Sequence, residues 1–86
     1  MLEAIKLSLR ITGNEFDTEI KDIIAGGKLD LTIAGIVKIG DDDPLILRAL
    51  TLYAKAHWGF NNAGEKYLDA YEALKVSLRL AGDYNA

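Results

Sequence analysis

Apolar side chains dominate the segment 43–60, which reads DPLILRALTLYAKAHWGF. Asp43 before Pro44 is typical of a helix start, and no residue interrupts a helical pattern until Gly59. At about 100° per residue, the polar side chains form one narrow stripe of Arg48, Thr51 and Lys55. The side opposite the stripe is apolar, with Ile46, Ala49, Leu50, Tyr53, Ala56 and Phe60. We therefore predict a central helix that other elements cover on most of its circumference.

Three further helices are predicted around it, over residues 1–11, from 14 or 17 to 34, and 64–81. Each has apolar residues spaced three and four apart along one side. These inward sides comprise Met1, Leu2, Ile5 and Leu9 in the first, Phe16, Ile20, Ile23, Ile24, Gly27, Leu31 and Ala34 in the second, and Tyr67, Ala70, Tyr71, Leu74, Leu78 and Ala81 in the last. The pattern predicts an all-α bundle of four helices with a largely buried third helix, in a single domain over residues 1–86.

Glycines mark most of the predicted helix ends. Gly13, Gly35 and Gly82 are expected to stop the first, second and last helices. Residues 36–39, which are apolar and β-branched, predict an extended loop or a brief strand. Asn62 and Glu65 have the spacing of a capping box at the start of the last helix.

The pair Gly26-Gly27 lies inside a predicted helix, where each glycine costs about 1 kcal/mol relative to alanine. Gly27 falls on the apolar side. Two explanations of this glycine stay open: another backbone approaches closely there, or the helix is kinked. Close packing is favoured.

Composition excludes several classes of function. The chain has 86 residues, a net charge of −3 and no cysteine, which excludes disulfides, thiolate metal sites and a thiol nucleophile. No run reaches the roughly 18 apolar residues of a membrane span, and the start of the chain lacks a signal-peptide layout. Mixed charge without a basic face does not favour DNA binding.

Candidate catalytic groups are few. His57, the single histidine, falls on the apolar side of the central helix, and we interpret it as a hydrogen-bonded histidine in a core or interface. Ser8 and Ser77 have no base nearby in sequence, and residues 41–43 lack the ligand alternation of a calcium loop. We expect no enzyme, no cofactor and no metal site.

Exposed apolar positions point instead to protein contacts. Trp58 and Phe60 end the central helix, and aromatic residues are enriched at interface centres. Two apolar strips lie outside the predicted inward sides: Ala25, Leu29 and Ile33 on the second helix, and Ala73, Val76 and Leu80 on the last. Such strips on a small domain suggest self-association. The predicted subunit interface therefore comprises Leu29, Ile33, Trp58, Phe60, Val76 and Leu80.

The order of these elements resembles the small head–tail connector proteins of tailed bacteriophages, also described as phage DNA-packaging proteins. The resemblance covers nearly the whole chain and is carried by Leu9-Arg10-Ile11, the run from Phe16 to Ile24, Asp43-Pro44-Leu45-Ile46, Lys55 to Gly59, and Tyr67, Tyr71 and Leu74. It implies a structural, homo-oligomeric subunit of the virion, made in the bacterial cytoplasm, which forms a ring at the portal and joins the head to the tail.

Within that resemblance, the expected partners are the portal protein and tail or stopper proteins, with no membrane and no specific nucleic acid. Candidate contacts to the portal or tail are Asp41, Asp42, Asp83 and Tyr84. The competing interpretation is a small cytoplasmic DNA-binding or DNA-packaging accessory protein. A basic stripe on the surface would favour it.

Overall fold

The computed structural model describes residues 1–85, and the last residue of the predicted domain, Ala86, lies outside them. The helices are α1 (Leu2–Ser8), α2 (Asp17–Ile33), α3 (Pro44–Trp58), a short 3₁₀ helix η1 (Phe60–Asn62), α4 (Gly64–Leu80) and the four-residue α5 (Gly82–Asn85). The described residues contain no strand, and residues 36–39 form an extended loop. The all-α prediction is confirmed, and α5 is an addition to it.

The central helix α3 forms as its sequence predicts. The Asp43 carboxylate accepts hydrogen bonds from the backbone nitrogens of Leu45 at 2.9 Å and Ile46 at 3.4 Å, which caps the helix start. Gly59 ends the helix in the left-handed conformation, with φ 71°. Within α3, the exposed residues are Pro44, Leu45, Arg48 and His57. The prediction of a mostly covered helix is therefore confirmed.

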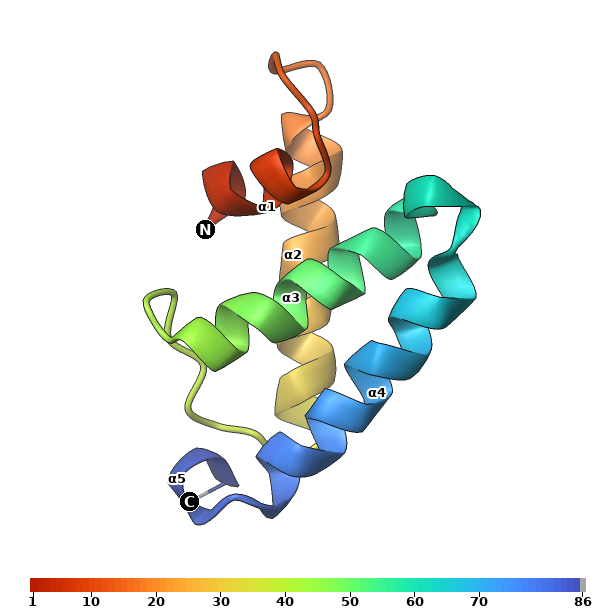
Figure 1. Cartoon of the computed structure of the whole chain (residues 1–86). Coiled ribbons are helices and arrows are strands. Elements are labelled where there is room, and N and C mark those ends of the chain that lie inside the picture. The colour runs from red at the N-terminus through yellow and green to blue at the C-terminus, as the bar shows by residue number, and fades with distance from the viewer. Residues whose placement is uncertain (86) are drawn as a thin grey trace.

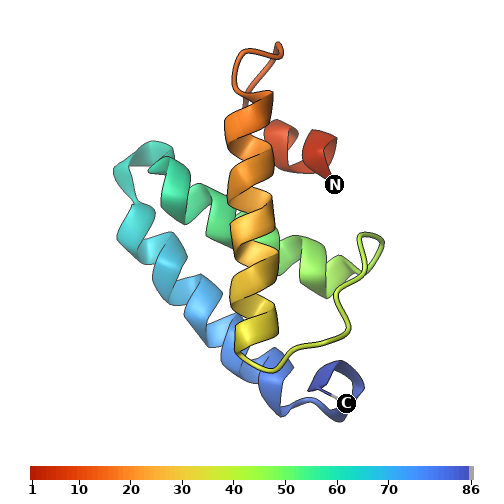
Figure 2. The ribbon, with the colours of Figure 1, turned by 180° about the vertical axis from the view of Figure 1, so that it is seen from behind.

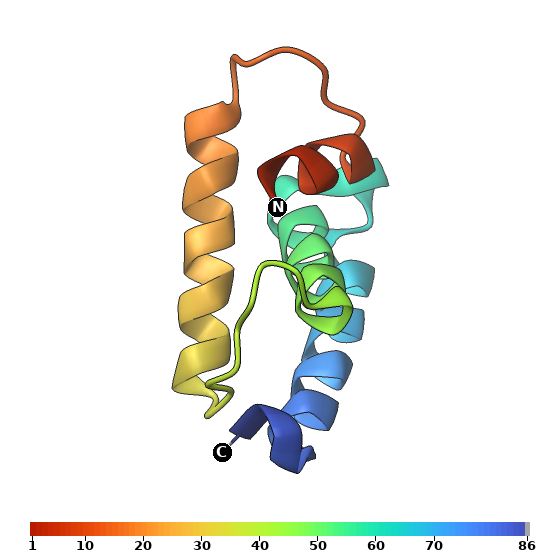
Figure 3. The same ribbon diagram turned by 90° about the vertical axis from the view of Figure 1, so that its left-hand side faces the viewer.

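The helices form two layers. Figure 1 shows α3 and α4 side by side, and Figure 2 shows α2 crossing α3 near its middle. In Figure 3, α2 forms one edge of the molecule while α1, α3 and α4 lie on the other side. The buried core lies between the layers and extends to the loop after α2. It consists of Ile5, Leu9, Ile20, Ile24, Leu31, Ile36, Ile46, Ala49, Leu50, Ala54, Tyr71 and Leu78.

Gly27 lies at a close contact between α2 and α3. A Cβ atom placed there would lie 2.8 Å from Cδ2 of Leu50 and 3.0 Å from Cδ1 of Tyr53. Both side chains belong to α3, so the missing Cβ of Gly27 allows the two helices to pack together. Close packing at this glycine is confirmed, but the nearest atoms belong to side chains of α3 and not to another backbone, as had been expected.

The end of α2 follows the prediction, whereas the end of α1 does not. Gly35 has φ 97°, and the Ile36 N–H donates to the Leu31 carbonyl, which closes a Schellman turn. In α1 the same turn closes earlier, because Arg10 takes the left-handed position with φ 60° and the Ile11 N–H donates to the Lys6 carbonyl. The helix thus ends at Ser8, and the prediction that Gly13 stops it was wrong.

The last helix, α4, begins at Gly64 as predicted and ends one residue before the predicted Ala81, but the residues expected to start and stop it do not do so. The residue before the helix is Ala63, and Asn62 makes no capping hydrogen bond, because it lies in η1 with φ 56°. Ala81 ends α4 in an extended conformation. Gly82, which was expected to stop this helix, instead begins α5.

Three residues assigned to inward sides are exposed. Phe16 is 46% exposed because it precedes α2 and lies beyond the core. Ala70 is on the surface of α4, beside the buried Tyr71. His57 is exposed in the last turn of α3, beyond the place where α2 crosses α3 around Leu50 and Tyr53 (Figure 2).

Candidate interaction surfaces

The outer side of α2 carries an aliphatic strip in contact with solvent. Leu29 is 61% exposed and Ile33 is 76% exposed, and Ala25 is exposed one turn before them. These residues lie on the side of the helix opposite Gly27 and Leu31, which face the core. We call Ala25, Leu29 and Ile33 the α2 strip. Figure 2 looks onto this outer side of α2.

A second aliphatic strip lies on the outer side of α4. Leu80 is 74% exposed, Val76 is 43% exposed, and Ala73 is exposed as well. The inner side of the same helix buries Tyr71 and Leu78. We call Ala73, Val76 and Leu80 the α4 strip. Since α2 and α4 lie at opposite edges of the domain in Figure 3, the two strips belong to different faces.

The two aromatic candidates at the end of α3 are already engaged within the subunit. Trp58 is partly buried and packs edge-on against Phe16, with 5.4 Å between ring centroids. Phe60 packs against Tyr67 at 6.1 Å, and the ammonium of Lys55 lies 5.0 Å from the centre of its ring. Both aromatic side chains therefore contribute to the fold, with only part of their surface left for a partner.

Four candidate contacts that are distant in sequence come together at one end of the molecule. The Tyr84 hydroxyl donates to the Asp43 carboxylate at 3.0 Å, and the Tyr84 carbonyl accepts from the Val37 N–H at 2.8 Å. These bonds bring α5, with Asp83 and Tyr84, against the loop that contains Asp41 and Asp42. We call this region the acidic end.

The side chains of the acidic end differ in their exposure and in their bonds. Asp41, Asp42 and Asp83 are exposed, and Asp41 pairs with Lys28 at 2.7 Å, whereas Tyr84 is partly buried. Burial would raise the pKa of the Asp43 carboxyl, but hydrogen bonds from Tyr84 and from two backbone N–H groups hold that pKa below its usual range. The hydrogen bond to Asp43 in turn raises the pKa of the Tyr84 phenol.

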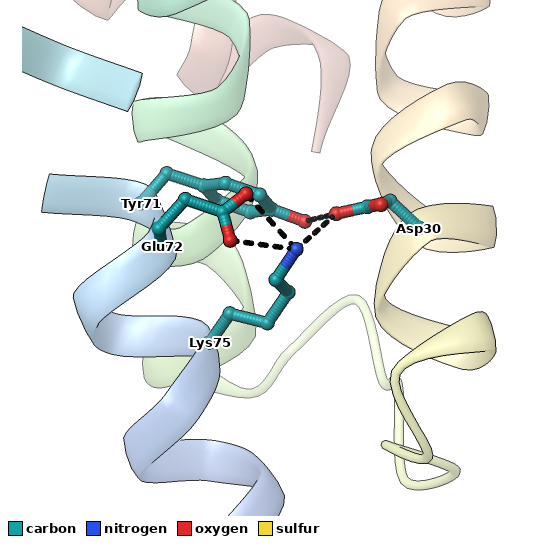
Figure 4. A network of polar contacts seen from close by, with 4 residues as sticks. All are labelled: Asp30, Tyr71, Glu72 and Lys75. Atoms are coloured by element: carbon teal, nitrogen blue, oxygen red, sulfur yellow. Dashed lines mark hydrogen bonds and ion pairs between the residues drawn. The ribbon is translucent and has the colours of Figure 1, made fainter. Parts of the chain in front are cut away.

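A polar bridge links α2 to α4, and the sequence reasoning did not find it. The Tyr71 hydroxyl donates to Asp30 at 2.5 Å, and Lys75 contacts both Asp30 and Glu72 at about 3.0 Å (Figure 4). Burial and the bond to Asp30 raise the pKa of Tyr71 well above its ordinary value. Burial would raise the pKa of Asp30, but its bonds from Tyr71 and Lys75 outweigh burial and lower it. The bridge fixes the angle between the two helices that carry the strips.

Lys6 makes a second buried polar contact, at the junction of α1 and α2. Its side chain pairs with Asp17 at 2.7 Å and donates to Asn14 at 3.3 Å, and the residue is only 5% exposed. The bond to Asp17 raises the pKa of Lys6. The sequence signal for this contact was a lysine directly after Ile5, which is itself a residue of the predicted inward side.

His57 lies in an open hollow of about 350 Å³, lined also by Ala56, Gly64, Glu65 and Leu68. Its ring lies against Tyr53, with 4.1 Å between centroids. His57 is therefore not a core histidine, and its place in an interface stays a prediction. In residues 1–85, no three His, Cys, Asp or Glu side chains are grouped so that they could hold a metal ion.

No helix in the described part of the chain is long and apolar enough to cross a membrane. Residues 1–85 match the family model described as phage connector protein. No curated protein and no solved structure matches the chain. Because the match covers all but the last residue, the chain belongs to the phage connector protein family.

Proposed function

We propose that this chain is a structural subunit of the head–tail connector of a tailed phage or prophage. Copies of it form a closed ring at the portal vertex of the virion and join the DNA-filled head to the tail. Membership of the phage connector protein family supports the general role. The ring and its partners are inferred from the surfaces of the subunit.

The observation that carries the proposal is the pair of aliphatic strips on opposite faces. A contact between two different surfaces is heterologous, and repetition of such a contact closes a ring when the rotation between neighbours allows it. Leu29, Ile33, Val76 and Leu80 are the large exposed aliphatic residues of the two strips. Trp58 and Phe60 contribute their remaining exposed surface at the end of α3.

The acidic end supplies the second kind of contact. Asp42 and Asp83 present exposed carboxylates there, and Asp41 and Tyr84 lie beside them in intramolecular bonds. In the proposed connector, this end meets the portal or a tail protein, because exposed charges at an interface steer association and fix orientation.

Four of the ten lysine and arginine side chains are already engaged within the subunit, which weakens the case for the competing DNA-binding function. Lys6, Lys28 and Lys75 are in ion pairs with carboxylates, and Lys55 lies over the rings of Phe60 and Tyr67. A phosphate-binding surface needs cations gathered on one face. A gel shift with DNA at low salt tests this directly. Tight DNA binding that is lost as the salt concentration rises would favour the DNA-binding function over the connector.

The ring is tested by placing charges on the α2 strip. Leu29→Asp with Ile33→Asp should leave the monomer folded by circular dichroism, because both side chains are exposed. The double variant should fail to assemble with the portal protein in sedimentation, since each unpaired charge buried in an interface costs several kcal/mol.

Thr12→Asp with Asn61→Asp is the matched control. It adds the same charge at two exposed positions outside both strips, Thr12 in the loop after α1 and Asn61 in η1, and it should assemble like the wild type. An α2-strip variant that folds and still assembles would place the interface elsewhere. If it unfolds, the strip is part of the core.

A further inference from the structure

The side of α3 that faces away from α2 carries cations and no acid. Leu50 and Tyr53 contact α2. Successive residues of a helix turn by about 100°, so Arg48 and Lys55, each two positions from one of these residues, lie on the opposite side. Figure 1 looks onto this side of α3, because α2 passes behind it. Residues 44–58 contain no Asp or Glu, so the helix itself offers these cations no opposite charge.

Arg10 adds a third cation at the end of α3. Its guanidinium lies 5.8 Å from the centre of the Phe60 ring, and the Lys55 ammonium lies 5.0 Å from the centre of the same ring. Such a contact holds a cation in place but does not neutralise its charge. Within residues 1–85, none of the three cations forms an ion pair with a carboxylate. We call Arg10, Arg48 and Lys55 the basic row.

Two acids of α4, the neighbour of α3, point away from the basic row. Glu72 pairs with Lys75, which faces α2. Glu65 lines the hollow of His57, and His57 lies two positions after Lys55, on the opposite side of α3. Neither acid therefore neutralises the basic row, and its charges remain available to a partner.

We propose that the basic row binds a short acidic segment of a partner protein, with Asp or Glu side chains against its three cations. In the proposed connector this partner is the portal or a tail protein, and only that identity rests on the proposed function. Arg48 and Lys55 are two helical turns apart, about 10 Å along the axis, so a few carboxylates cover the row. Complementary charges at such a contact speed association and fix the orientation of the partners.

The surroundings of the basic row favour a short acidic segment over nucleic acid. Duplex DNA carries a negative charge about every 1.7 Å along its axis and extends past any short row of cations. The rest of this chain would repel it, since the chain has 13 acidic side chains against 10 lysine and arginine side chains. A short acidic segment is confined to the row and avoids that repulsion.

Fluorescence anisotropy with a labelled peptide of eight glutamates tests the basic row on the isolated subunit. The wild type should bind the peptide at low salt. Arg10→Gln with Arg48→Gln should weaken binding about tenfold, because two exposed ion pairs are lost. Both residues are exposed, so circular dichroism should show a folded variant. A wild type that does not bind the peptide would overturn the inference and leave the connector role standing, because neither the ring nor the portal takes part.

Lys21→Gln with Lys38→Gln is the matched control. It removes the same charge at two exposed positions outside the row and should bind the peptide like the wild type. Equal losses in the two double variants would overturn the inference, because the peptide would then be attracted to cations in general. Amide chemical shifts give the location directly: the peptide should move those of Arg10, Arg48 and Lys55, and leave those of the two control lysines unchanged.

A labelled DNA duplex separates the acidic segment from nucleic acid. In the same buffer, the affinity for the duplex should be equal in the wild type and in Arg10→Gln with Arg48→Gln, because DNA does not use the row. A duplex that binds more tightly than the peptide, and loses its affinity in this variant, would assign the row to nucleic acid and overturn the inference.

Discussion

The two sides of α2 are built from the same kinds of side chain and end in opposite environments. On the inner side, Ile20 and Leu31 are fully buried. On the outer side, Leu29 and Ile33 are 61% and 76% exposed. Aliphatic content alone therefore does not decide burial. The neighbour decides, and within the subunit α2 has a neighbour only on the side that contains Gly27.

Gly27 explains why that side is the inner one. A Cβ atom there would lie too close to Leu50 and Tyr53 of α3, so its absence lets α2 pack against these side chains. On the outer side, Ala25 and Leu29 lead only to solvent. The comparison implies that mutations on the inner side change folding, whereas mutations on the outer side change assembly.

The largest effect is expected where α3 meets the inner side of α2. Leu50→Ala should reduce the free energy of unfolding by about 2–5 kcal/mol, because a fully buried leucine leaves a cavity. Thermal or urea denaturation measures this change. Leu45→Ala on the same helix is the control, since Leu45 is 44% exposed, and equal losses for both variants would refute the assigned core.

The two glycines of α2 should respond in opposite directions. Gly27→Ala forces Leu50 and Tyr53 to move and should destabilise the protein by about 1–2 kcal/mol net. Gly26→Ala meets only the Tyr53 hydroxyl at 3.3 Å, so the helix propensity of alanine should leave stability equal or raise it by up to about 1 kcal/mol. A lower melting temperature for Gly26→Ala than for Gly27→Ala would contradict the packing.

The polar bridge between α2 and α4 should make the free energy of unfolding depend on pH, by about 1 kcal/mol. The folded protein holds the pKa of Asp30 below its ordinary value, so its contribution to stability is present above about pH 4 and is lost as the pH falls through the lower folded pKa. Asp30→Asn should therefore lower the melting temperature at pH 7 and reduce its fall between about pH 4 and 2. Asp69→Asn, at an exposed position of α4, is the control and should melt like the wild type at pH 7.

The smallest effect is expected on the outer side. Leu29→Ala with Ile33→Ala should change the free energy of unfolding by no more than about 0.5 kcal/mol, because both side chains are exposed in the subunit. Rings of the same variant should dissociate at a higher protein concentration than rings of the wild type. A large loss of monomer stability in urea denaturation would mean that the two sides of α2 do not differ as described.

Local chemistry explains what could be predicted from the chain alone. Asp43 caps α3 with its own carboxylate, and Gly35 and Gly59 adopt the left-handed conformation that a helix end favours. These signals act over a few residues, so the start and end of the central helix and the all-α class follow from them. The strongest apolar periodicities also identified the buried sides of α2 and α3.

Local rules failed where two positions could serve the same purpose. Arg10 ends α1 although Gly13 has the better left-handed propensity, because the turn at Arg10 brings Ile11 back toward the core. Asn62 has the composition of a cap but lies in η1, whose path is fixed by the crossing from α3 to α4. In both cases packing overrides a preference of about 1 kcal/mol.

By itself, the sequence determined which segments are helical, where most of them stop and which sides are apolar. Only the tertiary structure decided that α2 crosses α3 at Gly27, which leaves His57 exposed beyond the crossing. It also decided that Asp30 meets Tyr71, forty-one positions later in the chain, and that Tyr84 meets Asp43. Helix caps and periodicity depend on neighbours in sequence, whereas these contacts depend on the angles between helices, which are set by packing of the whole core.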